Sequence, residues 1–556
     1  MESRRIGFIM NGSFRYGRGL ILVACACLPY LFGAFHGFVF DDHGTIVENS
    51  FLQNPAHSIQ AATLQTIGDA SVVDGNRPVV LLSYFLDRAV WGLRPFGYHL
   101  TNLLLHAAVT LLVFSLARRI GDVPGDWAPF AAAALFALHP ALTEAVQLPS
   151  YREDLLCVLF ILLCLRCSLI VSKGASALAV LFMIPAILSK ESAVAIPLLL
   201  AWLHGRLPVP VISRRRAWSL VMATGVIAAV FLAWWRHGPV LQAVNSSWNG
   251  LSLQFPSNLL TAPWIFLQYL RLLIAPWALA ADYVAAPITG ILDLRFFAGL
   301  LAMTFVAVVA FSAGKTPLAV GCGWMLLAFL PVSNLLPLFN PMAERYLYLI
   351  AVGFVLAAGW GLSRIRSQQV ATLALALICA LFAGRVIARL EDWKDDPTIW
   401  SATLDAQPRS ARAHTWLGLH QKQLGHREAA RTLFQQAEQL NPHDVSGLLN
   451  LAVLEGEAGR FEEADRLLRE AIRRQPKNIQ AHWNLSVARY NLGDEAGMIS
   501  SLEETLQLDP FYLPAHRARL DWLLATGQNE KAIPAARLLL EIDPTDKTAL
   551  HALPPP

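Results

Sequence analysis

The chain has 556 residues, of which 55% are hydrophobic and 15% are charged, and its mean hydropathy is +0.45. Because a soluble globular domain is about 25% charged, this composition excludes an ordinary soluble protein and indicates a surface that largely faces lipid. The formal net charge of +4 gives no argument for nucleic acid as a partner. Seven cysteines confined to apolar runs exclude a disulfide scaffold and a zinc cluster.

The first predicted element is a transmembrane helix over residues 19–40. Four arginines precede this uncharged run, which is longer than the apolar core of a signal peptide. We therefore place its basic end in the cytoplasm and its other end outside. Asp41 and Asp42 follow directly at that outer end, where they either begin a solvated loop or form a functional pair of carboxylates.

Apolar runs recur as far as residue 388, and we expect an all-α polytopic bundle of about 11–13 spans. The predicted spans are 19–40, 99–117, 127–143, 154–171, 175–188, 192–204, 217–235, 294–313, 317–337, 345–363 and 369–388. The pair 175–188 and 192–204 forms one long helix, two short helices or a re-entrant hairpin. The stretch 258–283, which Pro263 and Pro276 interrupt, lies in the interface or crosses twice.

The basic connections give an orientation to this bundle. Arginine and lysine gather at residues 118–119, 173, 206, 214–216, 315 and 364–366. Cytoplasmic connections of membrane proteins are enriched in these residues, so we place all six inside. Segments 41–98, 144–153, 189–191, 236–293 and 338–344 then lie outside, together with the last third of the chain.

A polar stripe marks the second predicted span. His99, Asn102 and His106 lie three and four residues apart and therefore share one helical face. Such a stripe faces either neighbouring helices or a water-filled cavity. No carboxylate or cysteine completes a local ligand set with the histidines, so the sequence supports no metal site.

Charged residues recur at the outer ends of the spans. Taken singly, each has a plain interpretation as an interfacial anchor. Together they place acids and cations around one outward-facing cavity, where cations can hold a phosphate and a carboxylate can accept a proton. The residues concerned are Asp41, Asp42, Arg152, Lys190, Glu344 and Arg345.

The last third of the chain is periodic. Pro408, Pro442, Pro476, Pro510 and Pro544 recur every 34 residues, and Gly425, Gly459, Gly493 and Gly527 keep the same period. This period with a closing proline indicates tetratricopeptide repeats, or TPRs, which stack as an α-solenoid. We expect a membrane domain over residues 1–390 and a TPR domain over 391–550, with units at about 411–442, 443–476, 477–510 and 511–544.

The ordered series of motifs resembles the transmembrane-and-TPR-containing protein O-mannosyltransferases, which are polytopic glycosyltransferases of the GT-C class. The motifs are FVFDD, RP followed by YHLTNLLLH, HP with TEAV and REDLL, SKES, APW with DY, and NLL with AERYLYL, ahead of the repeats. The resemblance covers about residues 18–545. It implies that mannose or a similar hexose moves from a polyprenyl-phosphate donor to an acceptor hydroxyl outside the cytoplasm, with no certain cofactor and no supported metal.

The resemblance also implies roles for individual residues. Asp41 and Asp42 match the catalytic acidic pair, and Arg152, Lys190 and Arg345 would hold the donor phosphate. The residues implied to bind substrate or to support the site are His99, His106, Asp154, Glu191, Asp282, Tyr283, Glu344 and Tyr346. Tyr151 and Glu153 depart from the family, since Gly and Ala are common there, as do Ile350 and Ala351, which replace Pro and Ser. These departures bear on the substrate more than on the reaction.

These observations lead to one main functional hypothesis and two alternatives. We expect Asp41 to act as a general base in a single displacement, and the TPR domain to bind an acceptor protein or glycan. One alternative is a transferase or ligase that modifies lipid A, O-antigen or a cell-wall glycan. The other is a non-enzymatic TPR scaffold in the membrane. The expected location is a bacterial inner membrane with a periplasmic site, or the endoplasmic reticulum membrane in a eukaryote.

Overall fold

The structure is a computed structural model that describes residues 17–69, 72–121, 125–207, 212–237, 255–336, 338–543 and 545–553. Across these ranges the regular secondary structure is helical and contains no strand, as predicted. The chain divides into two compact units, the first ending at Pro408 and the second beginning at Arg409. The first unit therefore continues past the expected boundary at residue 390.

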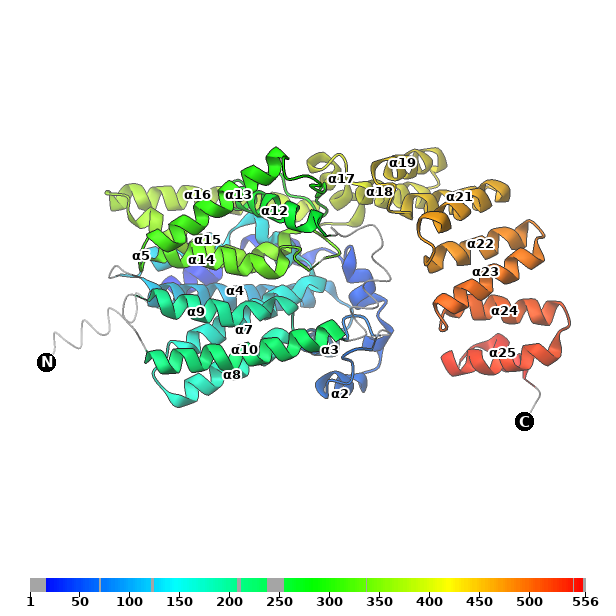
Figure 1. The fold of residues 1–556 in the computed structure, drawn as a ribbon, viewed down its shortest axis with the longest axis horizontal. Coiled ribbons are helices and arrows are strands. Elements are labelled where there is room, and N and C mark those ends of the chain that lie inside the picture. The colour runs from blue at the N-terminus through cyan, green and yellow to red at the C-terminus, as the bar shows by residue number, and fades with distance from the viewer. Residues whose placement is uncertain are drawn as a thin grey trace. The chain divides into compact units, whose positions relative to one another are not determined.

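The first unit is a bundle of helices that run side by side (Figure 1). It begins with the helix Gly17–Cys27. The α-helices that follow are α2 (His57–Ala62), α3 (Pro78–Trp91), α4 (Pro95–Ile120), α5 (Trp127–Ala137), α6 (Thr143–Gln147), α7 (Arg152–Ser168), α8 (Lys173–Ile187), α9 (Ile196–Arg206), α10 (Arg214–His237), α12 (Ser257–Ile274), α13 (Leu294–Ser312), α14 (Pro317–Phe329), α15 (Leu347–Ser363), α16 (Gln368–Asp392) and α17 (Asp396–Ala406). Short 3-10 or π turns link several of them, among them η1 (Pro29–Phe35), η2 (His43–Val47), η5 (Pro149–Tyr151), η6 (Glu191–Ala195) and η8 (Glu344–Tyr346).

The bundle is that of an integral membrane protein. Within the described ranges, five helical segments are long and apolar enough to cross a membrane, and two bent pairs raise this number to seven. The bent pairs, Gly17–Cys27 with Pro29–Phe35 and Trp127–Ala137 with Pro140–Gln147, turn by 41° and 54°. The sequence predicted more spans because several of its apolar runs, such as 175–188 and 317–337, form helices shorter than 18 residues. Within the two bent pairs, Pro29 and Pro140 interrupt the helix because proline lacks a backbone N–H.

The helices differ in how much they face lipid. The most apolar 18-residue windows of α4 and α15 are 50% and 56% buried, whereas those of α10, α13 and α16 are 17% buried. On α13 the side chains of Leu301, Phe305 and Phe311 are all more than two-thirds exposed. Since an apolar surface of this kind requires lipid, we place α4 and α15 at the centre of the bundle and α10, α13 and α16 at its edge.

The basic connections between the helices gather at one end of the bundle. At one end Arg118 pairs with Asp126 at 2.7 Å, and Arg206 donates to the carbonyl of Gly314 at 3.1 Å. Successive helices run in opposite directions, so the basic connections that the sequence singled out gather at this end. The turns that follow the first helix, α6, α8 and α14 lie at the opposite end, with α2 and α3 (Figure 1).

The second unit is the predicted solenoid. Its helices are α18 (Ala411–Gln423), α19 (Arg427–Leu440), α20 (Ser446–Glu457), α21 (Phe461–Arg474), α22 (Ile479–Asn491), α23 (Glu495–Leu508), α24 (Leu513–Ala525), α25 (Asn529–Ile542) and α26 (Lys547–Ala552). They stack as successive hairpins in chain order (Figure 1). Gly425 and Gly459 adopt φ of 81° and 75°, the left-handed conformation that closes a helix without a steric penalty from a Cβ.

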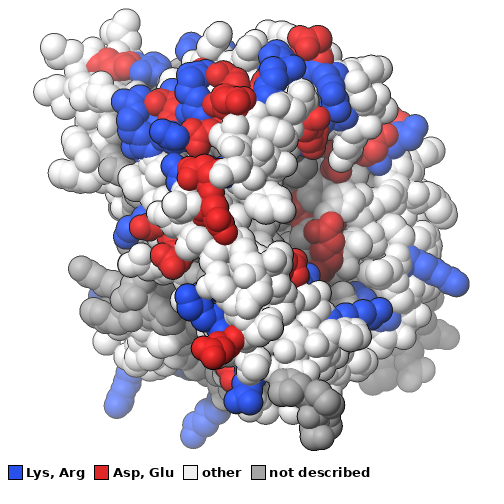
Figure 2. All heavy atoms as spheres, turned by 90° about the vertical axis from the view of Figure 1, so that its right-hand side faces the viewer, with Lys and Arg blue, Asp and Glu red and all other residues white. Residues whose placement is uncertain are grey.

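Periodic residues form the solenoid core. Ala430, Phe434 and Ala437 on α19 are buried, as are Ala464, Leu468 and Ala471 one repeat later on α21. Outside this core, acidic and basic side chains are interspersed over the face drawn in Figure 2. On α21 they alternate in pairs such as Arg466 with Glu463 at 2.6 Å. These exposed pairs keep the solenoid surface soluble, while contributing little each to its stability.

Candidate active site

Asp41 lies in a tight turn just after the first membrane helix. The residue before it, Phe40, has φ of 54°, which is uncommon for a side chain with a Cβ. The Oδ2 atom of Asp41 accepts a hydrogen bond of 2.7 Å from the hydroxyl of Tyr151. The side chain is partly exposed, and no residue in the described part of the chain bonds to its Oδ1 atom. Asp41 can therefore accept a proton from a molecule that enters from outside.

Asp42 has a different environment from its neighbour. Its side chain is fully buried. Its two oxygens accept hydrogen bonds from the backbone N–H groups of Ser150, at 2.8 Å, and Val39, at 3.2 Å. Burial raises the pKa of Asp42 to about 7, against hydrogen bonds from Ser150 and Val39 that lower it. Asp42 therefore closes the turn and ties it to η5, and of the two predicted catalytic acids only Asp41 is placed to meet a substrate.

Tyr151 links Asp41 to a cation. The guanidinium of Arg345 lies 4.2 Å from the centre of the Tyr151 ring, a cation–π contact. Burial raises the pKa of the Tyr151 hydroxyl well above its ordinary value, so it remains a donor to Asp41. Arg345 is held by Glu144, which accepts from its Nη1 at 2.8 Å and from its backbone N–H at 2.7 Å. Among the described residues no hydrogen bond engages Nε or Nη2 of Arg345.

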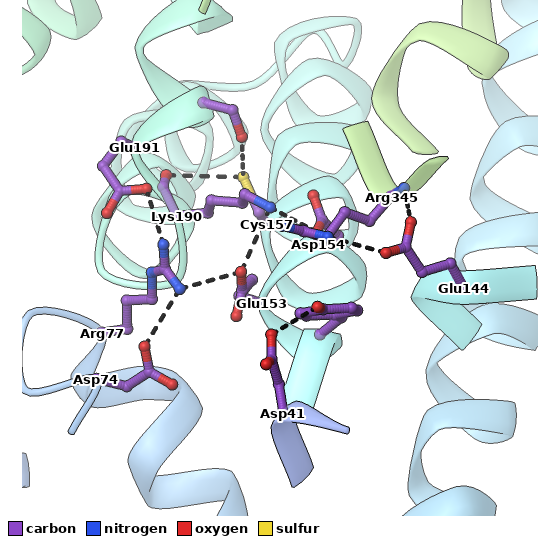
Figure 3. Close-up of polar contacts among 12 residues, drawn as sticks. Asp41, Asp74, Arg77, Glu144, Glu153, Asp154, Cys157, Lys190, Glu191 and Arg345 are labelled. Atoms are coloured by element: carbon purple, nitrogen blue, oxygen red, sulfur yellow. Dashed lines mark hydrogen bonds and ion pairs between the residues drawn. The ribbon is translucent and has the colours of Figure 1, made fainter. Parts of the chain in front are cut away.

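Lys190 lies in the break between α8 and η6 and points toward the same region (Figure 3). Its ammonium is 2.5 Å from Asp154 and 3.4 Å from Glu153, both on the first turn of α7. Burial lowers the pKa of Lys190, but these two carboxylates outweigh burial and the net shift is upward. Lys190 therefore carries a positive charge beside the Tyr346 ring, whose centre is 5.3 Å from Nζ.

Arg77 extends this cluster toward Asp74 and Glu191 (Figure 3). Its guanidinium pairs with Asp74 at 3.2 Å, Glu153 at 3.0 Å and Glu191 at 3.4 Å. Burial raises the pKa of Glu191, but the charges of Arg77 and Lys190 together with hydrogen bonds outweigh burial, and the net shift is downward. Glu153 connects Arg77 to Lys190, so the predicted residues Asp154, Lys190 and Glu191 belong to one network.

Arg152 is separate from this network, although it was predicted to hold the donor phosphate. Its side chain is fully buried and pairs with Asp87 at 2.6 Å. Its remaining bonds go to the side chains of Asn102 and Ser83 and to the carbonyl of Tyr98. All three guanidinium nitrogens are thus occupied within the protein, where they tie α7 to α3 and α4. We assign Arg152 to this packing role.

Glu344 and Tyr283 form a second buried group. Tyr283 donates to Glu344 at 2.9 Å, and Arg389 of α16 pairs with the same carboxylate at 3.2 Å. Both Glu344 and Arg389 are fully buried. The partly exposed Asp282 precedes Tyr283 in the segment between α12 and α13. Tyr283, Glu344 and Arg389 hold the segment between α12 and α13 against η8, the turn that also carries Arg345 and Tyr346.

The two histidines of α4 face the protein interior. The ring of His106 bonds with the hydroxyl of Tyr348 at 2.8 Å and the carbonyl of Ala137 at 3.1 Å. His99 is 2% exposed, and neither ring nitrogen has a hydrogen-bond partner among the described residues. Of the two interpretations of the polar stripe, helix packing describes His106 and Asn102, whose amide donates to the carbonyls of Val146 and Leu148.

Several contributors were not among the predicted site residues. Arg77 entered the sequence analysis only as part of the RP motif, without a role in the site, and Tyr151 and Glu153 only as departures from the family. The one sequence signal for Arg77, Asp74 and Glu153 is a charge placed next to a membrane span. Within the described ranges, no group of three or more His, Cys, Asp or Glu side chains is arranged to hold a metal ion.

Fold and site together define an all-α integral membrane protein with a charged cluster at one end of its bundle and a TPR solenoid after it. Residues 421–490 match the family model described as tetratricopeptide repeat. The chain is 26% identical to the protein O-mannosyl-transferase F38B6.6 of Caenorhabditis elegans over 417 residues, which cover 72% of this chain and 59% of that protein.

The chain is also 24% identical to the protein O-mannosyl-transferase TMTC3 of Mus musculus over 598 residues, covering 94% of this chain and 63% of that protein. These matches confirm the resemblance drawn from the motifs. The chain spans 59% and 63% of the length of these two relatives. Among solved structures, ArnT from Cupriavidus metallidurans bound to undecaprenyl phosphate is similar with a TM-score of 0.38 and 15% identity, covering 83% of this chain and 80% of ArnT.

Proposed function

We propose that the protein is a membrane glycosyltransferase that moves a hexose from a polyprenyl-phosphate donor to a hydroxyl of an acceptor protein on the non-cytoplasmic side. The observation that carries this proposal is the arrangement around Tyr151. An acid with a free oxygen lies at the hydroxyl of the ring, and a cation with uncommitted N–H groups lies over the face of the ring. The names of the relatives support mannose as the sugar.

Asp41 would act as the general base. As the acceptor oxygen forms a bond to the anomeric carbon, its proton passes to Asp41. The bond between that carbon and the donor phosphate breaks, and its electron pair leaves with the polyprenyl phosphate. A base positioned in this way contributes about 10²- to 10⁴-fold to the rate. Tyr151 orients the carboxylate for this step by donating to the oxygen that does not face the acceptor.

Arg345 and Lys190 would stabilise the leaving phosphate. A guanidinium and an ammonium held by buried carboxylates are preorganised, so they gain interaction energy as negative charge develops on the phosphate. Both lie at the end of the bundle that carries Asp41. The polyprenyl chain would lie against the apolar helices, and the TPR solenoid would bind the acceptor protein.

The test is transfer of labelled mannose from a polyprenyl-phosphate donor to protein in membranes that contain the full chain. Asp41→Asn keeps the size of the side chain but removes the base, and it should lower transfer by about 10²- to 10⁴-fold. Glu48→Gln is the matched control, because Glu48 is exposed in the same segment, and it should transfer at the wild-type rate.

Three results would contradict the proposal. Full transfer by Asp41→Asn would remove its catalytic base. Label that appears in lipid A, O-antigen or a cell-wall glycan, with none in glycopeptides analysed by mass spectrometry, would replace the protein acceptor by a glycan. Absence of any transfer by the wild-type chain with either acceptor would favour the scaffold.

A further inference from the structure

Helix α17 contacts the turn that carries Asp41. The carboxylate of Asp396, the first residue of α17, accepts from the backbone N–H of Phe40 at 2.6 Å through Oδ1. Its other oxygen, Oδ2, lies 3.2 Å from Nε2 of His43. One side chain thus holds residues on both sides of the Asp41–Asp42 pair.

The backbone of this turn needs such support. Phe40 has φ of 54°, in the left-handed region, which strains a residue with a Cβ and persists only where the surroundings impose it. The Phe40 ring packs edge-on against Trp400 of α17, with centroids 5.1 Å apart and planes at 83°. The hydrogen bond from Phe40 and the ring contact with Phe40 are both made to α17. Phe40 directly precedes Asp41, so these contacts fix the backbone from which the Asp41 side chain projects.

α17 is itself firmly placed. Asp395 caps its N-terminus by accepting from the backbone N–H of Thr398 at 3.0 Å. The hydroxyl oxygen of Thr403 accepts from the backbone N–H of Ala281 at 3.1 Å. Trp400 and Ile399 are almost completely buried. The helix is therefore a fixed support against which the turn is held.

We propose that Asp396 is a positioning residue for the transfer reaction, which holds the Phe40 turn so that Asp41 faces the acceptor hydroxyl. This inference rests on the proposed role of Asp41. It assigns a function to α17, which lies in the range that the sequence analysis placed in the TPR domain. A base displaced by about 1 Å can lose about 100-fold in rate, so the contacts of Asp396 bear on turnover without any contact with the substrate.

The test compares Asp396→Ala, which removes both acceptors, with Asp396→Asn, which keeps one oxygen for the Phe40 N–H. In the full-length protein, Asp396→Ala should lower kcat about 10- to 100-fold and leave KM for the donor unchanged, since Arg345 and Lys190 are untouched. Asp396→Asn should restore most of the turnover. Asp405→Ala, an exposed aspartate on the same helix, should behave as wild type.

A second measurement does not depend on activity. Amide hydrogen exchange of a peptide that contains Phe40 should be faster in Asp396→Ala than in wild type and in Asp405→Ala, because its N–H has lost its acceptor. If Asp396→Ala does not fold, Asp396→Ser replaces it, since serine keeps a polar start to α17 but is too short to hold both partners.

The proposal is overturned if Asp396→Ala turns over at the wild-type rate, if the exchange is unchanged, or if Asp396→Asn is as impaired as Asp396→Ala. Asp41→Asn is assayed in parallel to separate the two hypotheses. Full activity of Asp41→Asn defeats the proposed function itself, whereas loss there with full activity of Asp396→Ala defeats only the positioning role.

Discussion

Asp41 and Asp42 are adjacent in the sequence, yet burial gives them opposite tasks. Asp42 is fully buried with its oxygens occupied by backbone N–H groups, whereas Asp41 is partly open. A pair of carboxylates after a membrane helix therefore divides into one that builds the turn and one that can react. The sequence could place the pair but could not assign these tasks, because they depend on η5, which lies more than a hundred residues further along the chain.

The raised pKa of Asp42 predicts a pH dependence of stability. Burial raises it to about 7, whereas an unfolded aspartate has a pKa of about 3.9. Between these values the folded protein retains a proton that the unfolded chain has lost, so the contribution of Asp42 to stability is full at low pH and declines as pH rises through 7. Asp42→Asn mimics the neutral form and should flatten this decline.

Thermal unfolding in detergent at pH 5 and at pH 8 measures this effect. The unfolding midpoint of the wild-type protein, measured relative to that of Asp42→Asn, should be lower at pH 8 than at pH 5. Asp69→Asn, a change at an aspartate of the same outer segment, serves for comparison. A wild-type midpoint that keeps a constant distance from that of Asp42→Asn would show that Asp42 is ionised throughout.

Arg152 and Arg345, two buried arginines with the same predicted role, differ in how many of their guanidinium nitrogens are bonded within the protein. Arg345→Lys keeps the charge but loses the planar group that stacks on Tyr151 and offers several N–H donors. A charge-assisted hydrogen bond contributes about 1.5–3 kcal/mol, so we expect a loss of about 10- to 100-fold in kcat/KM for the donor. Arg295→Lys, at a partly exposed arginine paired with Asp293, should have no effect on transfer. Equal activity of Arg345→Lys and wild type would contradict the proposal that the guanidinium of Arg345 binds the donor phosphate.

At the scale of elements, the central helices of the membrane unit meet at glycines. A Cβ on Gly321 of α14 would lie 2.3 Å from the carbonyl oxygen of Gly353 of α15, and a Cβ on Gly353 would lie 2.6 Å from that of Gly321. Membrane helices have little hydrophobic drive to associate, so close backbone approach of this kind is a main source of their packing energy.

Gly321→Ala should therefore destabilise the protein by about 1–3 kcal/mol, the usual cost of overpacking a core. Gly361→Ala is a matched change on α15, where a Cβ would meet open space, and it should leave stability unchanged or raise it slightly. Thermal unfolding of both variants in the same detergent makes the comparison. Equal midpoints for Gly321→Ala and wild type would mean that the backbones of α14 and α15 are farther apart than these distances imply.

Elements were predicted from the sequence to different degrees. The solenoid was foreseen in detail, because a 34-residue period repeats its own core positions, such as Ala430 and Ala464. The membrane spans were foreseen as apolar runs, but their breaks were not, since Pro29 and Pro140 fall within runs that hydropathy alone reads as continuous. The buried ion pairs Arg152–Asp87 and Arg389–Glu344 were also missed as pairs, because no local pattern joins residues so far apart in the chain.

At the scale of the whole molecule, chain direction ties the site to the solenoid. α16 starts at the basic end of the bundle with Gln368 and finishes at the site end with Asp392. α17 then packs against the turn of Asp41, and the solenoid begins only a few residues later. Since α16 is the last candidate membrane span among the described residues, we expect the candidate active site and the solenoid to be exposed on the same side of the membrane.

This arrangement predicts the outcome of cysteine labelling with a membrane-impermeant maleimide. Glu48→Cys at the site end and Gln436→Cys on α19 place exposed thiols in the two units, and Lys315→Cys places one at the basic end. Positive-inside orientation puts the basic end in the cytoplasm. Glu48→Cys and Gln436→Cys should then react in intact cells, or in spheroplasts, and Lys315→Cys only after the membrane is permeabilised. The wild-type chain, whose own cysteines lie in the apolar helices, gives the background. If the Glu48→Cys and Gln436→Cys thiols reacted from opposite sides, no acceptor held by the solenoid could reach Asp41, and the two units would have to act independently.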